Sequence, residues 1–101
     1  KYTAVFASND MIAMQVMHML RANDYRIPED VSLIGYDNVT AAQYLDVPLT
    51  TVEQYENQIG RRAGEYLLAG IENPAGARIA REIVIIPNLV VRESTTHPPQ
   101  E

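Results

Sequence analysis

The stretch IPEDVSLIGYDN, residues 27–38, decides the fold of this chain. Pro28 begins a turn, the compact run Val31–Ile34 favours a β-strand, and Gly35 opens a polar loop after it. In open α/β sheets, ligands bind just beyond the carboxyl ends of parallel strands. Asp37 therefore stands where a hydrogen-bond acceptor for a small polar molecule would be useful.

On its N-terminal side, this strand is preceded by another strand and a helix. Residues 2–7 read as a buried strand because they are rich in β-branched and aromatic side chains. Ser8, Asn9 and Asp10 follow, and each is a good N-cap for a helix that runs to about Asn23. Spacings of three and four residues place one apolar face of that helix at Ile12, Val16, Met19 and Leu20.

On the C-terminal side, helices and strands continue to alternate. We expect a short, weakly helical piece at residues 39–45, an extended segment at 49–52 and the best helix of the chain at 56–71. Residues 79–86 read as a strand, and residues 89–92 extend again. Strands that alternate with helices predict an α/β fold with a parallel sheet flanked by helices. The longest helix has an apolar stripe at Ile59, Ala63, Tyr66, Leu67 and Gly70.

The composition excludes several classes of protein. The chain has 101 residues, enough for one domain at most, and because it starts at Lys1 and leads almost directly into a strand, we take it to be a piece of something longer. It has no Cys, which excludes disulfide scaffolds, zinc–thiolate sites and cysteine nucleophiles. The net charge of −5 disfavours direct contact with nucleic acid. The apolar runs are far too short to cross a membrane.

No catalytic constellation is visible in the sequence. The Ser residues lack a Gly-x-Ser-x-Gly setting, the Gly residues form no phosphate-binding pattern, and the two His residues lack the spacing of a metal site. Glu53 and Glu56 lie near the start of a predicted helix, where surface carboxylates favour the helix dipole. We therefore expect no enzyme activity, no cofactor and no metal.

Two polar pairs follow the first two predicted strands. Asn9 and Asp10 stand after the first, and Asp37 and Asn38 stand after the second. We interpret Asp10 mainly as a helix cap, whereas the amide of Asn9 offers a donor and an acceptor at the edge of a cleft. Because adjacent strands of a parallel sheet end at the same edge, both pairs are expected to face one crevice.

All four Met residues of the chain lie in the first predicted helix. Met14 and Met17 widen its apolar arc beyond one ordinary face, which predicts a helix buried on most sides. One interpretation is a core helix between a strand and a neighbour. The other is an oligomer interface, where flexible thioether side chains adapt to a partner.

Several short motifs resemble those of one family. They are Ile-Pro-Glu-Asp-Val-Ser, Gly-Tyr-Asp-Asn, Pro-Leu-Thr-Thr-Val-x-Gln and Leu-Val-Val-Arg-Glu-Ser-Thr, and the match runs from Thr3 to about Thr95. In this order and spacing they resemble the C-terminal part of LacI/GalR-type bacterial transcriptional repressors. The resemblance implies a two-lobed domain like a type I periplasmic sugar-binding protein, with an effector in the cleft between the lobes. It also implies a cytoplasmic protein that binds DNA through a helix-turn-helix headpiece, which these residues do not include.

The resemblance implies roles for individual residues as well. Asp37 matches an aspartate that contacts effector hydroxyls or ring nitrogens, and Asn9 matches an amide that lines the same pocket in sugar-responsive members. Purine-responsive members tend to have glycine at the position of Asn9, so we expect the effector to be a sugar. Gln54 matches a glutamine at the crossover between the lobes.

The family's dimer contacts map to the Met-bearing helix and to the segment after Asp37. This makes Met14, Met17, Ala41 and Leu45 the expected interface of a homodimer, and it favours the interface interpretation of the Met residues.

The resemblance also divides the chain. Residues 1–95 are expected to be the C-terminal portion of the effector-binding and dimerisation domain. The end of the chain from Ser94 onward, with its two Pro residues, reads as frayed, and we expect a flexible tail at residues 96–101. Because much of a typical repressor is absent, this piece is expected to rearrange or to swap elements with another copy. The alternative interpretation is an extracytoplasmic sugar-binding protein of a transport system.

Overall fold

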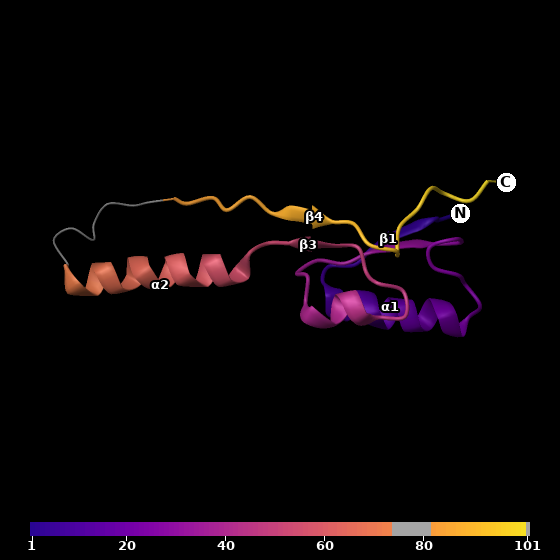
Figure 1. The fold of residues 1–101 in the computed structure, drawn as a ribbon, viewed down its shortest axis with the longest axis horizontal. Helices are drawn as coiled ribbons and strands as arrows, with labels where there is room; N and C mark the ends of the chain where they lie inside the picture. Colours follow the sequence, from indigo (N-terminus) through magenta and orange to yellow (C-terminus); the bar gives the residue numbers. More distant parts are fainter. Residues whose placement is uncertain (74–81, 101) are drawn as a thin grey trace. The chain divides into compact units, whose positions relative to one another are not determined.

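The computed structural model describes residues 1–73 and 82–100, and these form two compact units. The first unit joins Lys1–Glu53 to Asn88–Glu101, and the second unit is Gln54–Pro87. The elements follow one another as strand, helix, strand, short 3₁₀ helix, strand, helix and strand, which confirms the predicted alternation (Figure 1).

The strands of the first unit form two pairs that share a bridge. β1 (Ala4–Phe6) pairs in parallel with β2 (Ser32–Ile34), as predicted for an α/β fold. β3 (Thr51–Glu53) pairs antiparallel with β4 (Asn88–Val90), and a parallel bridge between Ile34 and Thr50 joins the pairs. The predicted extended segments at 49–52 and 89–92 are thus confirmed as strands with slightly shifted ends.

The helix α1 (Asp10–Ala22) connects β1 to β2 and covers one side of that strand pair (Figure 1). The 3₁₀ helix η1 (Thr40–Tyr44) follows β2 and confirms the short helical piece predicted at residues 39–45. The Ile27–Pro28 peptide bond in the turn before β2 is cis. The core between these elements is apolar and nearly free of solvent; it consists of Ala7, Ala13, Met17, Ile27, Leu33, Ala42 and Leu49.

The predicted apolar face of α1 is correct for Val16 and Leu20, which pack against the core, and wrong for Ile12 and Met19, because the helix is slightly rotated from the predicted orientation. The buried residues are Asp10, Ala13 and Met17, whereas Ile12 and Met19 are 43% and 64% exposed. The rotation follows from Asp10, whose carboxylate is bonded inside the fold and so turns its own side of the helix inward. A pattern that counts apolar residues alone treats this aspartate as a surface residue.

The prediction that the first strand is buried is also wrong. Phe6 is 68% exposed, and Ala4 is exposed too. Among the described residues of this unit, a helix covers only one face of the strand pair, so the alternate side chains of β1 remain in solvent.

The second unit consists of α2 (Glu56–Glu72) and an irregular segment at residues 82–87. The helix agrees with the prediction, but none of its residues is buried. Of the strand predicted at 79–86, residues 79–81 lie outside the described residues, and residues 82–86 form no strand because no described neighbour pairs with them. Neither helix in the described part of the chain has the length and apolar content of a membrane span.

Candidate functional site

The loops after β1 and β2 lie together at one edge of the sheet. The parallel register pairs Phe6 with Ile34, so both strands end at the same edge. Two backbone bonds then continue between the loops: Ala7 N–H donates to the Ile34 carbonyl at 2.8 Å, and Asp10 N–H donates to the Tyr36 carbonyl at 2.9 Å. Both loops therefore lie at one edge of the sheet, as predicted, whereas a crevice that both polar pairs face stays a prediction.

The residue that caps α1 is Asn9, not Asp10. The Asn9 side-chain oxygen accepts a hydrogen bond from the backbone N–H of Ile12 at 2.9 Å, which satisfies one of the free donors of the first turn. The Asn9 side chain is also partly exposed at the edge where the two loops meet. Its position is therefore fixed by the cap while it remains accessible.

Asp10 is instead an internal anchor with no exposed surface. Its carboxylate accepts a hydrogen bond from the Val39 N–H at 2.8 Å and another from the Thr51 hydroxyl at 2.6 Å. Gly35 makes room for it, because a Cβ at that position would collide with the Asp10 carboxylate and lie 3.0 Å from Leu49. The interpretation of Asp10 as a helix cap missed this role because both donors come from distant parts of the chain.

The loop that carries Asp37 has an unusual backbone. Asp37 has φ 119° and Asn38 has φ 56°, in the range that side-chain-bearing residues rarely adopt. The Asp37 N–H donates to the Val52 carbonyl at 3.0 Å, and the Asn38 N–H contacts the Thr51 hydroxyl at 3.2 Å. Residues held in such conformations cluster at binding sites, where the surrounding structure offsets a cost of about 1–3 kcal/mol each.

The side chain of Asn38 bonds this loop to β3 and to the segment that follows β4. Its oxygen accepts a hydrogen bond from the Arg92 guanidinium at 2.7 Å, and its NH₂ group lies 3.4 Å from the Glu53 carboxylate. Arg92 also donates to the Leu49 carbonyl at 3.0 Å. The loop, β3 and the segment after β4 are thus bonded through a single amide.

The end of the chain contributes a buried network that the sequence interpretation missed. Ser94 has no exposed surface; its hydroxyl donates to the Leu33 carbonyl at 2.6 Å and accepts from the Thr50 N–H at 2.8 Å. Thr95 bonds the Thr50 hydroxyl at 2.9 Å. Ser94 is therefore not frayed, and the hydroxyl-rich pairs at residues 50–51 and 94–95 are the signal that could have revealed the contact. The backbone N–H and carbonyl of Thr96 both hydrogen-bond the Ser32 hydroxyl. The flexible tail at residues 96–101 stays a prediction.

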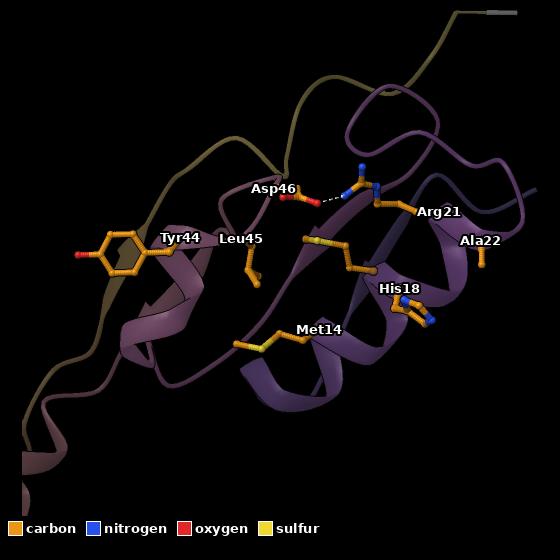
Figure 2. A pocket seen from close by; sticks show the side chains of 8 residues that line it. Met14, His18, Arg21, Ala22, Tyr44, Leu45 and Asp46 are labelled. Atoms are coloured by element: carbon orange, nitrogen blue, oxygen red, sulfur yellow. Dashed lines mark hydrogen bonds and ion pairs between the residues drawn. The ribbon is translucent and has the colours of Figure 1, made fainter.

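A separate hollow of about 610 Å³ lies between α1 and the segment after η1 (Figure 2). Met14 and Leu45 extend into it from opposite sides, and an ion pair of 2.9 Å between Arg21 and Asp46 crosses its rim. Its lining residues are Met14, Met17, His18, Arg21, Ala22, Tyr44, Leu45 and Asp46. The hollow thus combines apolar walls with charged edges.

Comparison with known families identifies the domain. A model described as periplasmic binding protein-like domain matches residues 1–95. The chain belongs to this family.

Among the described residues, no group of His, Asp or Glu side chains is placed to hold a metal ion.

The relatives of this periplasmic binding protein-like chain are LacI-family regulators. Over 92 residues it is 42% identical to the HTH-type transcriptional repressor PurR of Vibrio vulnificus and 40% identical to the ribose operon repressor of Haemophilus influenzae. In both comparisons the alignment covers 91% of this chain and 27% of the relative, so the chain spans about a quarter of their length. The names of both relatives describe repressors of transcription.

A solved structure agrees with this assignment. The LacI family transcriptional regulator of Enterococcus faecalis V583, determined with bound ribose, is 38% identical to this chain and superposes with a TM-score of 0.86. The match covers 97% of this chain and 35% of that protein. The α/β fold of the present chain is therefore a part of a type I periplasmic binding protein-like fold.

Some predicted site residues lie elsewhere in the chain. Gln54 begins the second unit, one residue after Glu53, and its role in binding stays a prediction. Of the predicted interface residues, Met14, Met17 and Leu45 line the hollow, and Ala41 is exposed on η1. Met17 is only 5% exposed and belongs to the core, so it has little surface left for a partner.

Proposed function

We propose that this chain is the ligand-sensing and dimerising part of a sugar-responsive transcriptional regulator. The observation that carries the proposal is the constrained Asp37–Asn38 loop beside Asn9, at the carboxyl edge of the parallel strands. Ligands of open α/β folds bind at this edge. The regulator names of the relatives support the same function.

The effector that fits this edge is a polyhydroxylated molecule. The Asp37 carboxylate can accept hydrogen bonds from two neighbouring hydroxyl groups, and the Asn9 amide can donate to a third oxygen while its own oxygen caps α1. A charge-assisted bond of this kind contributes about 1.5–3 kcal/mol. Ribose is the first candidate, because one relative is a ribose operon repressor and another was determined with bound ribose.

The effector acts by linkage. A ligand shifts a conformational equilibrium only by the difference in its affinity for the two states. The Asp37–Asn38 loop is bonded to β3, after which the chain enters the second unit, and to Arg92, which follows the return strand β4. A ligand that changes this loop therefore acts on both connections, with Gln54 at the beginning of the second unit as a further contact.

Dimerisation in this proposal uses the hollow beside α1. Met14 and Leu45 supply its apolar surface, and Met17 supports them from the core. Ala41, which is exposed on η1, is a further proposed contact outside the hollow. The partner is a second copy of the protein, while DNA is contacted only through a helix-turn-helix headpiece outside these residues. The protein would work in the cytoplasm, without a membrane partner, a cofactor or catalysis.

The effector proposal is tested by ligand binding to the full-length protein. Isothermal titration with ribose, glucose and adenine separates pentose, hexose and purine binding, and thermal shift gives an independent readout because a ligand of the folded state raises the melting temperature. We expect saturable binding of a sugar and none of adenine. Saturable adenine binding without any sugar binding would contradict the proposed effector class.

The dimer proposal has its own test. Leu45→Glu places a charge in the hollow, and light scattering should then give half the mass of the wild-type dimer. Met19→Glu, at an exposed position of α1, is the control and should leave the mass unchanged. A wild-type protein that is monomeric, or a Leu45→Glu variant that remains dimeric, would refute this interface.

A further inference from the structure

The buried carboxylate of Asp10 has no direct part in the proposed effector site. Its two hydrogen bonds, from the Thr51 hydroxyl at 2.6 Å and the Val39 N–H at 2.8 Å, lie wholly inside the first unit. Burial of a carboxylate is unfavourable unless such bonds replace its water. Since Asn9 already caps the helix, Asp10 is not needed there for capping.

Both ends of the effector loop are attached to this one residue. The Asp10 N–H donates to the Tyr36 carbonyl at 2.9 Å, before the loop, and the Asp10 carboxylate accepts from the Val39 N–H, after it. Asp37 and Asn38, with their positive φ angles, lie between these two attachments. Asp10 therefore spans the loop at its base.

Thr51 completes the arrangement from β3. Its hydroxyl donates to the Asp10 carboxylate and lies 3.2 Å from the Asn38 N–H, for which it is the acceptor. Thr51 has no exposed surface. One hydroxyl thus joins the buried carboxylate to the backbone of the residue after Asp37.

We infer that Asp10 and Thr51 are positioning residues that hold Asp37 and Asn38 in the backbone conformation that binds the effector. This inference rests on the proposed function of the loop. Without the two attachments, Asp37 and Asn38 would relax toward negative φ, which non-glycine residues prefer, and the Asp37 carboxylate would turn with the backbone. If the loop adopts the binding conformation for only a fraction of the time, the apparent Kd of the ligand equals the intrinsic Kd divided by that fraction.

The decisive comparison is between Thr51→Val and Thr51→Ser in the full-length protein. Valine keeps the shape of threonine but loses the hydroxyl, whereas serine retains it. Loss of a charge-assisted bond predicts that Thr51→Val raises the Kd for ribose about tenfold or more. Thr51→Ser should remain within about twofold of the wild-type Kd, because the same donor and acceptor are present.

Hydrogen–deuterium exchange distinguishes local loosening of the effector loop from general destabilisation of the first unit. In Thr51→Val, peptides that cover residues 36–39 should exchange faster, while peptides from α1 and β2 should keep the wild-type rate. General destabilisation would instead accelerate exchange across the whole first unit. Asp10→Asn should show the same selective pattern, with Asp30→Asn, a carboxylate at the surface, as the control.

The outcomes separate this inference from the proposed function. An unchanged Kd together with unchanged exchange in Thr51→Val would overturn it, and so would faster exchange spread evenly over the unit. If the wild-type protein binds no sugar, the proposed function fails, and the exchange pattern alone decides whether Asp10 and Thr51 hold the loop. Asp10→Asn adds a second variant, so poor folding of either one leaves the other as a test.

Discussion

The two units of the chain differ in what stabilises them. The first unit has an apolar core around Leu33 and Leu49, and its connecting segments are held by hydrogen bonds of Asp10 and Ser94. In the second unit no residue of α2 is buried, and Leu67 is 66% exposed. The same chain thus contains one region with its own interior and another whose apolar residues lie on the surface.

This difference shows how little a helical pattern says about burial. The stripe on α2 is amphipathic, and it predicted the helix correctly, but a helix gains most of its stability only when that stripe packs against something. The first unit meets this requirement internally. The second unit is expected to meet it with another surface, in line with the expectation that this piece rearranges or swaps elements with another copy.

The largest contrast is expected for leucines in the two units. Leu33→Ala removes a side chain with no exposed surface, and it should lower the free energy of unfolding of the 101-residue chain by about 2–5 kcal/mol. Leu68 on α2 is 58% exposed, so Leu68→Ala should change the free energy of unfolding by no more than about 0.5 kcal/mol. Urea unfolding followed by circular dichroism measures both. Equal losses would mean that α2 is packed in solution.

Two glycines give the next contrast, because substitution by Ala should lower the stability of the chain at one of them and raise it at the other. Gly35→Ala forces a Cβ into the Asp10 carboxylate and Leu49, and it should destabilise the chain by about 1–3 kcal/mol. Gly64→Ala meets no atom within 4 Å and should stabilise α2 by about 0.5–1 kcal/mol. Denaturant midpoints of the two variants provide the test, and a stabilising Gly35→Ala would contradict the close approach of Asp10.

Disruption of the hydrogen-bond network around Ser94 should lower the stability of the chain by an amount similar to that of Gly35→Ala. Ser94→Ala leaves the buried Thr50 N–H without its acceptor and the Leu33 carbonyl without this donor, which should cost about 1–3 kcal/mol. Ser8→Ala, at an exposed residue, should cost no more than about 0.5 kcal/mol. Thermal unfolding of the two variants distinguishes an anchored C-terminal segment from a frayed one.

The smallest effect is expected at the surface of the first unit. The side-chain hydrogen bond from the Arg26 guanidinium, followed by the bond from the Arg26 backbone N–H, lowers the pKa of the Asp30 carboxyl below its ordinary value. A depressed pKa in the folded state adds stability above the unfolded-state pKa, near about 4, and this stability is lost as the pH falls toward the folded-state pKa. NMR titration should show that Arg26→Gln raises the Asp30 pKa, whereas Arg21→Gln should not.

Local patterns predicted the elements well. Strand propensity placed β1 and β2, the spacing of apolar residues placed α1 and α2, and the parallel pairing put Asn9 and Asp37 at one edge. Each of these features depends on residues that are close in sequence or on the geometry of neighbouring strands.

The contacts between distant residues could not be predicted in the same way. Asp10 bonds a residue 41 positions away, and Ser94 bonds one 61 positions away. Polar side chains with such distant partners look like surface or capping residues in a sequence. For the same reason the rotation of α1, which Asp10 sets, was predicted incorrectly.

The most direct test of the central claim is the affinity of the Asp37→Ala variant for ribose, measured by isothermal titration in the full-length protein. Glu29→Ala, which removes an exposed carboxylate before β2, is the matched control. We predict that Asp37→Ala loses ribose binding while dimer mass and operator binding stay at the wild-type level, and that Glu29→Ala binds normally. Wild-type affinity for ribose in Asp37→Ala would contradict the placement of the effector at this loop.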